Sequence, residues 1–155
     1  MEKILKSLKN KIWKLFMYKK QTTLLTSKEK LLYQAVSDFN FNKVKFFLKQ
    51  NINPNIIVYG YSLLMMAILQ NKQNNLSLVK LLLSYNADPN IQTLPQYTPL
   101  YVAIWFGKYD ILLALLEHGA NLDENYEDNF GGKLLHTAVL YQYVEISKLL
   151  YLLQI

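Results

Sequence analysis

The sequence predicts an all-α protein, a solenoid of stacked antiparallel helix pairs, and two observations lead to this prediction. Four apolar segments are centred on alanines spaced by 32, 36 and 35 residues, and a second apolar block follows each of them. Such a period is typical of a unit that cannot bury its apolar face alone and stacks on its neighbours. A hydrophobic fraction of 52% is enough for a packed core, and there is no cysteine to crosslink it. The four alanines are Ala35, Ala67, Ala103 and Ala138.

The first expected element is a basic amphipathic helix over residues 1–20, followed by a linker at 21–26. On a helical wheel six of its apolar residues fall within an arc of about 120°, while Trp13, Met17 and Tyr18 lie off this stripe. Seven lysines and one glutamate give this segment the whole formal net charge of +6, and the rest of the chain is neutral overall. The apolar stripe is Ile4, Leu5, Leu8, Ile12, Leu15 and Phe16, and the lysines outside it are Lys3, Lys6, Lys9, Lys11 and Lys14.

Three roles are compatible with this segment. As a cap, its apolar stripe covers the open face of the first repeat while its lysines stay in water. As a membrane contact, residues 1–18 lie on an anionic surface that attracts the lysines. As a flexible targeting arm or a calmodulin-like target, it acts apart from the stack. Nucleic acid is not expected as a partner, because the chain has no arginine and its neutral body offers no basic stripe.

The repeat domain at 27–155 is divided into four units, each with two helices and a hairpin-like loop, at about 27–57, 58–92, 93–125 and 126–155. The third unit carries the clearest signals. Thr98 caps its first helix because the hydroxyl accepts an orphan amide hydrogen, and Pro99 fits the first helical position. Gly107 ends that helix, and Gly119 supplies the left-handed residue after the second helix. The residues at the place of Gly119 in the two earlier units are Asn51 and Asn86.

This pattern resembles the ankyrin repeat over residues 27–155. The segments that carry the resemblance are TPLYVA at 98–103, NADPN at 86–90, GANLD at 119–123 and LLHTA at 134–138. Three of the four units lack the Thr-Pro pair, and Tyr101 stands where the family prefers histidine. The resemblance implies a non-catalytic module that binds a protein partner through a concave groove and through the loop tips between units.

The positions that the resemblance assigns to partner contact are rich in aromatic residues. They lie in the loop tips before each first helix, and two and three residues after each aligned alanine. Tyrosine and tryptophan are enriched at binding hot spots because they bring large rigid area at small entropic cost. Packing of these rings inside the stack is the alternative, above all for Phe106 beside Gly107. The expected contact residues are Tyr59, Tyr61, Tyr97, Trp105, Phe106, Phe130 and Tyr141.

The sequence gives no support for an enzyme, a cofactor or a metal site. Its only histidines are His118 and His136, and it has no cysteine. The acidic loop at 123–132 does not fit a calcium-binding EF-hand loop. Counted from Asp123, the sixth and twelfth positions hold Asp128 and Leu134, where glycine and glutamate are required.

No secretory signal or transmembrane span is evident, since the uninterrupted apolar runs are far shorter than the ~20 residues that a span needs. We therefore expect a cytoplasmic location, in host cytoplasm if the source is an intracellular bacterium or a virus. The chain stops at Ile155, within an apolar helix. Truncation would account for this end, as would its coverage by another chain, for example a second copy in a homo-oligomer.

Overall fold

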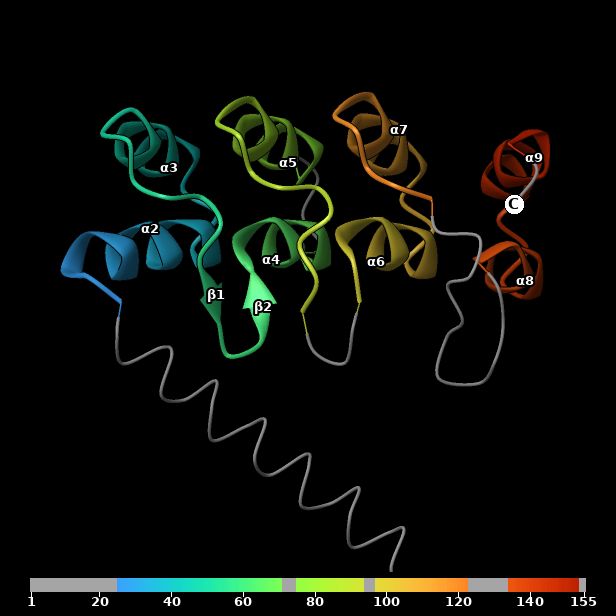
Figure 1. The fold of residues 1–155 in the computed structure, drawn as a ribbon, viewed down its shortest axis with the longest axis horizontal. Helices are drawn as coiled ribbons and strands as arrows, with labels where there is room; N and C mark the ends of the chain where they lie inside the picture. The colour runs from blue at the N-terminus through green and yellow to red at the C-terminus, as the bar shows by residue number, and fades with distance from the viewer. Residues whose placement is uncertain (1–24, 71–74, 94–96, 123–133, 154–155) are drawn as a thin grey trace, which may run out of the picture.

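The computed structural model describes residues 25–70, 75–93, 97–122 and 134–153, and these residues form four helix pairs in two layers (Figure 1). The first helices of repeats 1 to 4 form one layer: α2 (Ser27–Ser37), α4 (Leu63–Leu69), α6 (Pro99–Trp105) and α8 (Leu134–Leu140). The second helices form the other: α3 (Phe41–Leu48), α5 (Asn75–Ser84), α7 (Tyr109–Glu117) and α9 (Val144–Leu152). The predicted all-α solenoid of stacked helix pairs is confirmed.

Several predicted features lie outside the described residues. They are the amphipathic helix at 1–20 with its five named lysines, most of the linker at 21–26, and Phe130. Among the described helices, none has both the length and the apolar character that crossing a membrane requires.

The first helices pack side by side along the stack, because small residues occupy the faces where they meet. Each first helix contacts the second helix of its own repeat, and α4 also contacts both α2 and α6. All four aligned alanines are buried, so neighbouring backbones approach closely without losing the core. Long apolar side chains fill the space between the layers, and fully burying each one contributes about 1.5–3 kcal/mol. The largest of those that are wholly enclosed include Leu32, Leu64, Leu82, Leu112 and Leu115.

Hydroxyl side chains begin the first helices of three repeats. Thr26, Ser62 and Thr98 each accept a hydrogen bond from the backbone N–H three residues further on, at 3.2 Å in every case. Pro99 then takes the first helical position in α6, as the sequence predicts. Each such cap contributes about 1 kcal/mol by satisfying an amide that has no helical partner.

Left-handed residues end the helices where the sequence predicts them. Asn51, Asn86 and Gly119 have φ of 58°, 63° and 82° after the second helices, and Gly107 has φ of 63° after α6. The turns equivalent to Gly107 in repeats 1 and 4 hold residues with side chains in the same conformation. They are Phe39 and Gln142, with φ of 58° and 59°.

The loop before α4 is a short antiparallel hairpin of β1 (Ile57–Val58) and β2 (Tyr61–Ser62), in which Val58 pairs with Tyr61. The two-residue turn between them consists of Tyr59 and Gly60, with φ of 52° and 86°. Positive φ at both central residues matches the twist of a tight hairpin.

Successive loops are joined by two asparagine side chains. The Asn90 amide donates to the carbonyl oxygen of Gly119 at 2.9 Å, and its oxygen accepts from the backbone N–H of Asn121 at 2.7 Å. Asn55 makes the same two bonds one repeat earlier, at 3.2 and 2.7 Å. One side chain thus satisfies both a donor and an acceptor of the next loop, which fixes the spacing between repeats.

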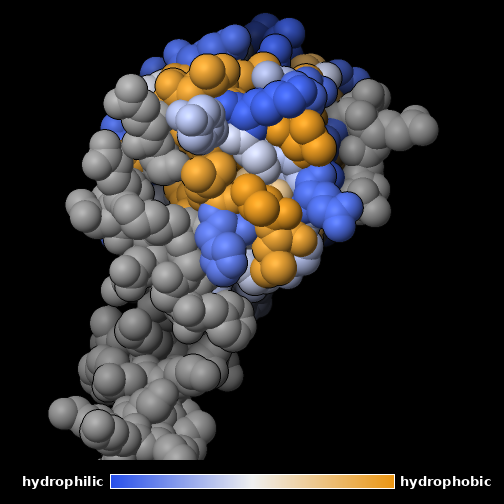
Figure 2. Space-filling view, turned by 90° about the vertical axis from the view of Figure 1, so that its right-hand side faces the viewer, coloured by the Kyte–Doolittle hydropathy of each residue, from blue (hydrophilic) through white to orange (hydrophobic). Residues whose placement is uncertain are grey.

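The face of repeat 4 that points away from repeat 3 carries hydrophobic patches between hydrophilic ones (Figure 2). The exposed apolar side chains of α8, α9 and the residues beside them are Val139, Leu140, Tyr141, Val144, Tyr151, Leu152 and Leu153.

Candidate partner-binding groove

A cavity of about 300 Å³ lies between the first helices of repeats 2 and 3, and we call it the groove. Residues of β2 and α4 form one wall, and α6 with the loop before it forms the other. None of the described residues that line it is charged, and neither α4 nor α6 contains a charged residue. The lining residues are Tyr61, Met65, Leu69, Tyr97, Tyr101, Val102, Trp105 and Phe106.

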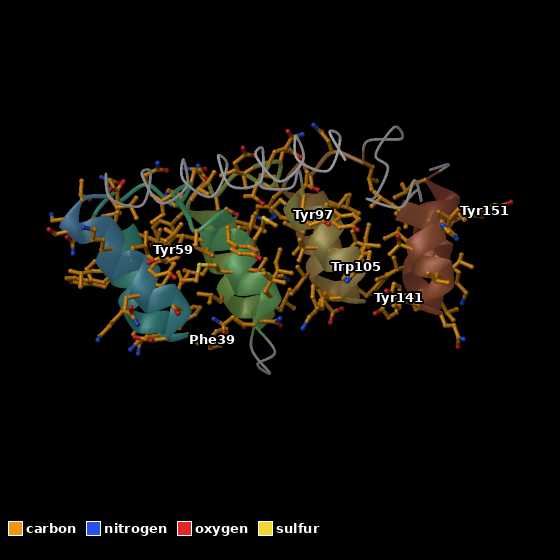
Figure 3. All side chains as sticks on the ribbon, turned by 90° about the horizontal axis from the view of Figure 1, so that it is seen from below. Phe39, Tyr59, Tyr97, Trp105, Tyr141 and Tyr151 are labelled. Carbon is orange, nitrogen blue, oxygen red and sulfur yellow. The ribbon has the colours of Figure 1, made fainter. Side chains whose placement is uncertain are left out.

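Five aromatic rings contact one another in a continuous row beside the groove, and we call them the aromatic row: Tyr97, Tyr101, Trp105, Tyr141 and Tyr143. The Tyr97 and Tyr101 rings are stacked with centroids 4.8 Å apart. The next three steps along the row are 5.8, 5.6 and 5.9 Å. Figure 3 shows Trp105 between Tyr97 and Tyr141, so the row runs from the loop before α6 to repeat 4.

The rings of the groove differ in depth. Tyr101 is only 4% exposed, Tyr97 and Trp105 are half-buried, and Phe106 is 50% exposed at the end of α6. The indole N–H of Trp105 makes no hydrogen bond to the described part of the chain and is not buried, so it keeps its contact with water. The groove therefore has an aromatic wall that includes Trp105, whose indole can donate a hydrogen bond, and an exposed ring at its rim.

Tyr143 holds the end of α6 in place. Its hydroxyl donates to the carbonyl oxygen of Trp105 at 3.4 Å. Its ring lies so close to Gly107 that a Cβ there would be 2.6 Å from the ring carbon Cε1. Glycine at this turn thus serves both the left-handed backbone and the close approach of Tyr143, and together they fix where Trp105 and Phe106 lie.

Tyr59 lies apart from the groove, at the tip of the hairpin, where it is 64% exposed (Figure 3). Its ring contacts the edge of Tyr33 at a centroid distance of 6.3 Å. Partial burial, with a smaller contribution from the Tyr59 phenol, raises the pKa of Tyr33 above its ordinary value. A bulky residue with positive φ costs about 1–2 kcal/mol relative to glycine, and such strain is most often retained at functional sites.

The structure brings together most of the predicted contact residues that it describes. Four of them line the groove, and Tyr141 joins them through its contact with the Trp105 ring. Sequence reasoning did not select Tyr101, although its spacing of four residues from Trp105 places both rings on one side of a helix. Gln70, at a position that the resemblance assigns to contact, instead donates to the Ser37 carbonyl oxygen at 3.2 Å and links repeats 1 and 2.

Within the described residues, no group of three histidine, aspartate or glutamate side chains is arranged to hold a metal ion. The stacked helix pairs, joined by asparagine side chains between successive loops, define a helical-repeat scaffold. The groove lies between two of its first helices, and its described lining residues are uncharged.

The family is established by comparison. A protein-family model that describes ankyrin repeats (3 copies) matches residues 3–93 and 71–154 of the sequence. The chain therefore belongs to the ankyrin-repeat family. This match begins upstream of residue 27, where the predicted repeats begin. The chain is also 35% identical over 96 residues to a putative ankyrin repeat protein of Rickettsia bellii (strain RML369-C). That alignment covers 61% of this chain and 36% of the relative. Ankyrin repeats are generally protein–protein interaction modules and typically non-catalytic.

Proposed function

We propose that this chain binds a protein partner by taking apolar side chains of the partner into the groove, without catalysis. Tyr97, Trp105 and Tyr141 act as the anchors, and Phe106 closes over the bound side chains from the rim. The observation that carries this proposal is the continuity of the uncharged groove with the aromatic row.

The groove is suited to this role because its rings are positioned before a partner arrives. Tyr101 is enclosed, and the end of α6 is held by the Tyr143 hydroxyl and by the fit of that ring against Gly107. Ordering a mobile side chain at an interface costs about 0.5–1.5 kcal/mol, and rings that are already packed avoid most of this cost. A volume of about 300 Å³ lies at the small end of the range for ligand sites, so the groove holds a few side chains of a larger partner.

The test is a comparison of three proteins in a capture experiment from a cell lysate. The native chain is compared with Trp105→Ala/Tyr141→Ala, and Tyr151→Ala removes an exposed ring from α9 as the matched control. Thermal melts first establish that the variants are folded. A protein that is retained by the native chain and by Tyr151→Ala, but lost by the double variant, supports the groove. Equal retention by all three contradicts it.

Self-association is a second candidate function, and the apolar end face of repeat 4 favours it (Figure 2). Exposed apolar patches of this kind usually mark interaction sites. Among the described large apolar residues, Tyr151 and Leu152 are the most exposed, at 74% and 76%. On this view the native chain forms a dimer at high concentration and Leu152→Glu remains monomeric. A molar mass from light scattering that stays at the monomer value across a wide concentration range would contradict self-association.

A further inference from the structure

We infer that the groove takes an uncharged, proline-containing segment of the partner in the polyproline II conformation. This inference rests on the proposed function and specifies the chemistry of the partner. The argument uses the charge of the groove, its size, its hydrogen-bonding groups and the spacing of its rings.

The absence of charge in the groove determines the charge of its occupant. No described residue that lines the groove is charged, so a lysine or carboxylate brought against them would lose water without gaining an opposite charge. A segment whose buried positions are apolar and uncharged avoids this cost.

The hydrogen-bonding groups favour proline. Any backbone N–H that enters an apolar groove must find an acceptor, and proline has none to satisfy. A proline-containing segment brings mainly carbonyl oxygens, which need donors. Trp105 lines the groove, and its indole N–H is accessible to solvent and makes no hydrogen bond to the described residues, so it can donate to such a carbonyl. Donor and acceptor needs are therefore complementary across this contact.

The shape favours an extended segment over a helix. An α-helix with its side chains is about 10–12 Å wide and buries several side chains of one face at once. A cavity of about 300 Å³ is at the small end of the range for ligand sites and accommodates only a few side chains. The steps from Tyr101 to Trp105 and from Trp105 to Tyr141 are each under 6 Å. Because Tyr141 lies beside the groove, these rings continue its apolar contact past α6, which suits an extended polyproline II segment that returns a side chain to the same face every three residues.

The entropy of binding favours the same occupant. A polyproline II segment is already extended before it binds, so little conformational freedom is lost when it docks in an aromatic-lined groove. With a wall that is also fixed, both surfaces meet near their bound conformations.

The experiment selects a phage-displayed library of random twelve-residue peptides on the native chain. Peptides that also bind Trp105→Ala are removed, and the remainder must still bind Tyr151→Ala. We expect these peptides to be enriched in prolines three residues apart and depleted in charged residues. Phe106→Ala, which changes only the exposed rim, gives a second counter-selection if Trp105→Ala unfolds.

The affinity of one selected peptide then tests the conformation. Emission from Trp105 is followed in a Trp13→Phe background, so that it is the sole tryptophan reporter. Replacing the prolines of the peptide with glycine should weaken binding at least 10-fold. Equal binding of the glycine peptide overturns the inference, as does a selected set with charged or helical amphipathic patterns.

The two proposals fail in different ways. If no peptide depends on the groove, but a protein from the lysate is lost in the Trp105→Ala/Tyr141→Ala variant, the polyproline inference is wrong and the groove remains the binding surface. If neither a peptide nor a protein depends on the groove, both proposals are wrong.

Discussion

Replacing Asn90 with alanine should weaken the junction between repeats 2 and 3 while leaving every helix intact. The side chain makes two hydrogen bonds to the next loop, to the Gly119 carbonyl at 2.9 Å and from the Asn121 N–H at 2.7 Å. A hydrogen bond of this kind contributes about 0.5–1.5 kcal/mol net. Because both backbone partners are near the surface and regain water, we expect a loss of about 1–2 kcal/mol in the free energy of unfolding.

The charge variant Asn90→Asp separates hydrogen bonding from packing. Its carboxylate still accepts from Asn121 but faces the Gly119 carbonyl oxygen with no proton to donate. Below the ordinary aspartate pKa of about 4 the carboxyl regains a donor. The stability deficit relative to the native chain should therefore be largest at neutral pH and shrink as the pH falls through that value.

The assay is urea unfolding followed by far-ultraviolet circular dichroism, with Asn55→Ala as the matched control at the preceding junction. Stability in a repeat protein is approximately a sum of repeat and junction contributions, so both alanine variants should lower the midpoint. Two results would refute this account of the Asn90 hydrogen bonds. One is a loss in the free energy of unfolding below about 0.3 kcal/mol for Asn90→Ala, and the other is an Asn90→Asp stability deficit that does not change with pH.

Three further predictions concern two left-handed turns and the N-terminal segment. Gln142→Gly should raise the free energy of unfolding by about 1 kcal/mol, because an exposed residue at φ 59° gains from losing its Cβ; a lower melting temperature would contradict this. Gly107→Ala should lower the free energy of unfolding more than Gly119→Ala, because a Cβ at residue 107 also clashes with the Tyr143 ring. Equal losses of stability in the two variants would show that this contact is unimportant. If residues 1–18 bind membranes, the emission maximum of Trp13 in a Trp105→Phe background moves to shorter wavelength when anionic vesicles are added. An unchanged emission maximum would contradict membrane contact.

The fold was predictable because its signals are local. The alanine period, the Thr98 cap and the left-handed positions at Asn51, Asn86 and Gly119 each follow from residue type and spacing. These signals place the helices and their ends without knowledge of any long-range contact.

The groove was only partly predictable because its geometry depends on residues far apart in the chain. Tyr143 reaches the Trp105 carbonyl from 38 positions away, and no local pattern announces that contact. Likewise, the sequence indicates a left-handed residue at Gly107 but not the ring that excludes a Cβ there. The positive φ of Tyr59 was also unexpected, since two-residue hairpin turns favour asparagine or glycine at that place.

The central claim is that the groove is the surface that binds a partner, and isothermal titration with a captured partner tests it most directly. A central anchor contributes at least about 2 kcal/mol, which corresponds to a roughly 30-fold change in the dissociation constant. We predict that Trp105→Ala weakens binding by at least this factor and that Tyr151→Ala binds like the native chain. Native affinity in a folded Trp105→Ala variant, with affinity lost in Tyr151→Ala instead, would contradict the account and move the binding surface to the end of the stack.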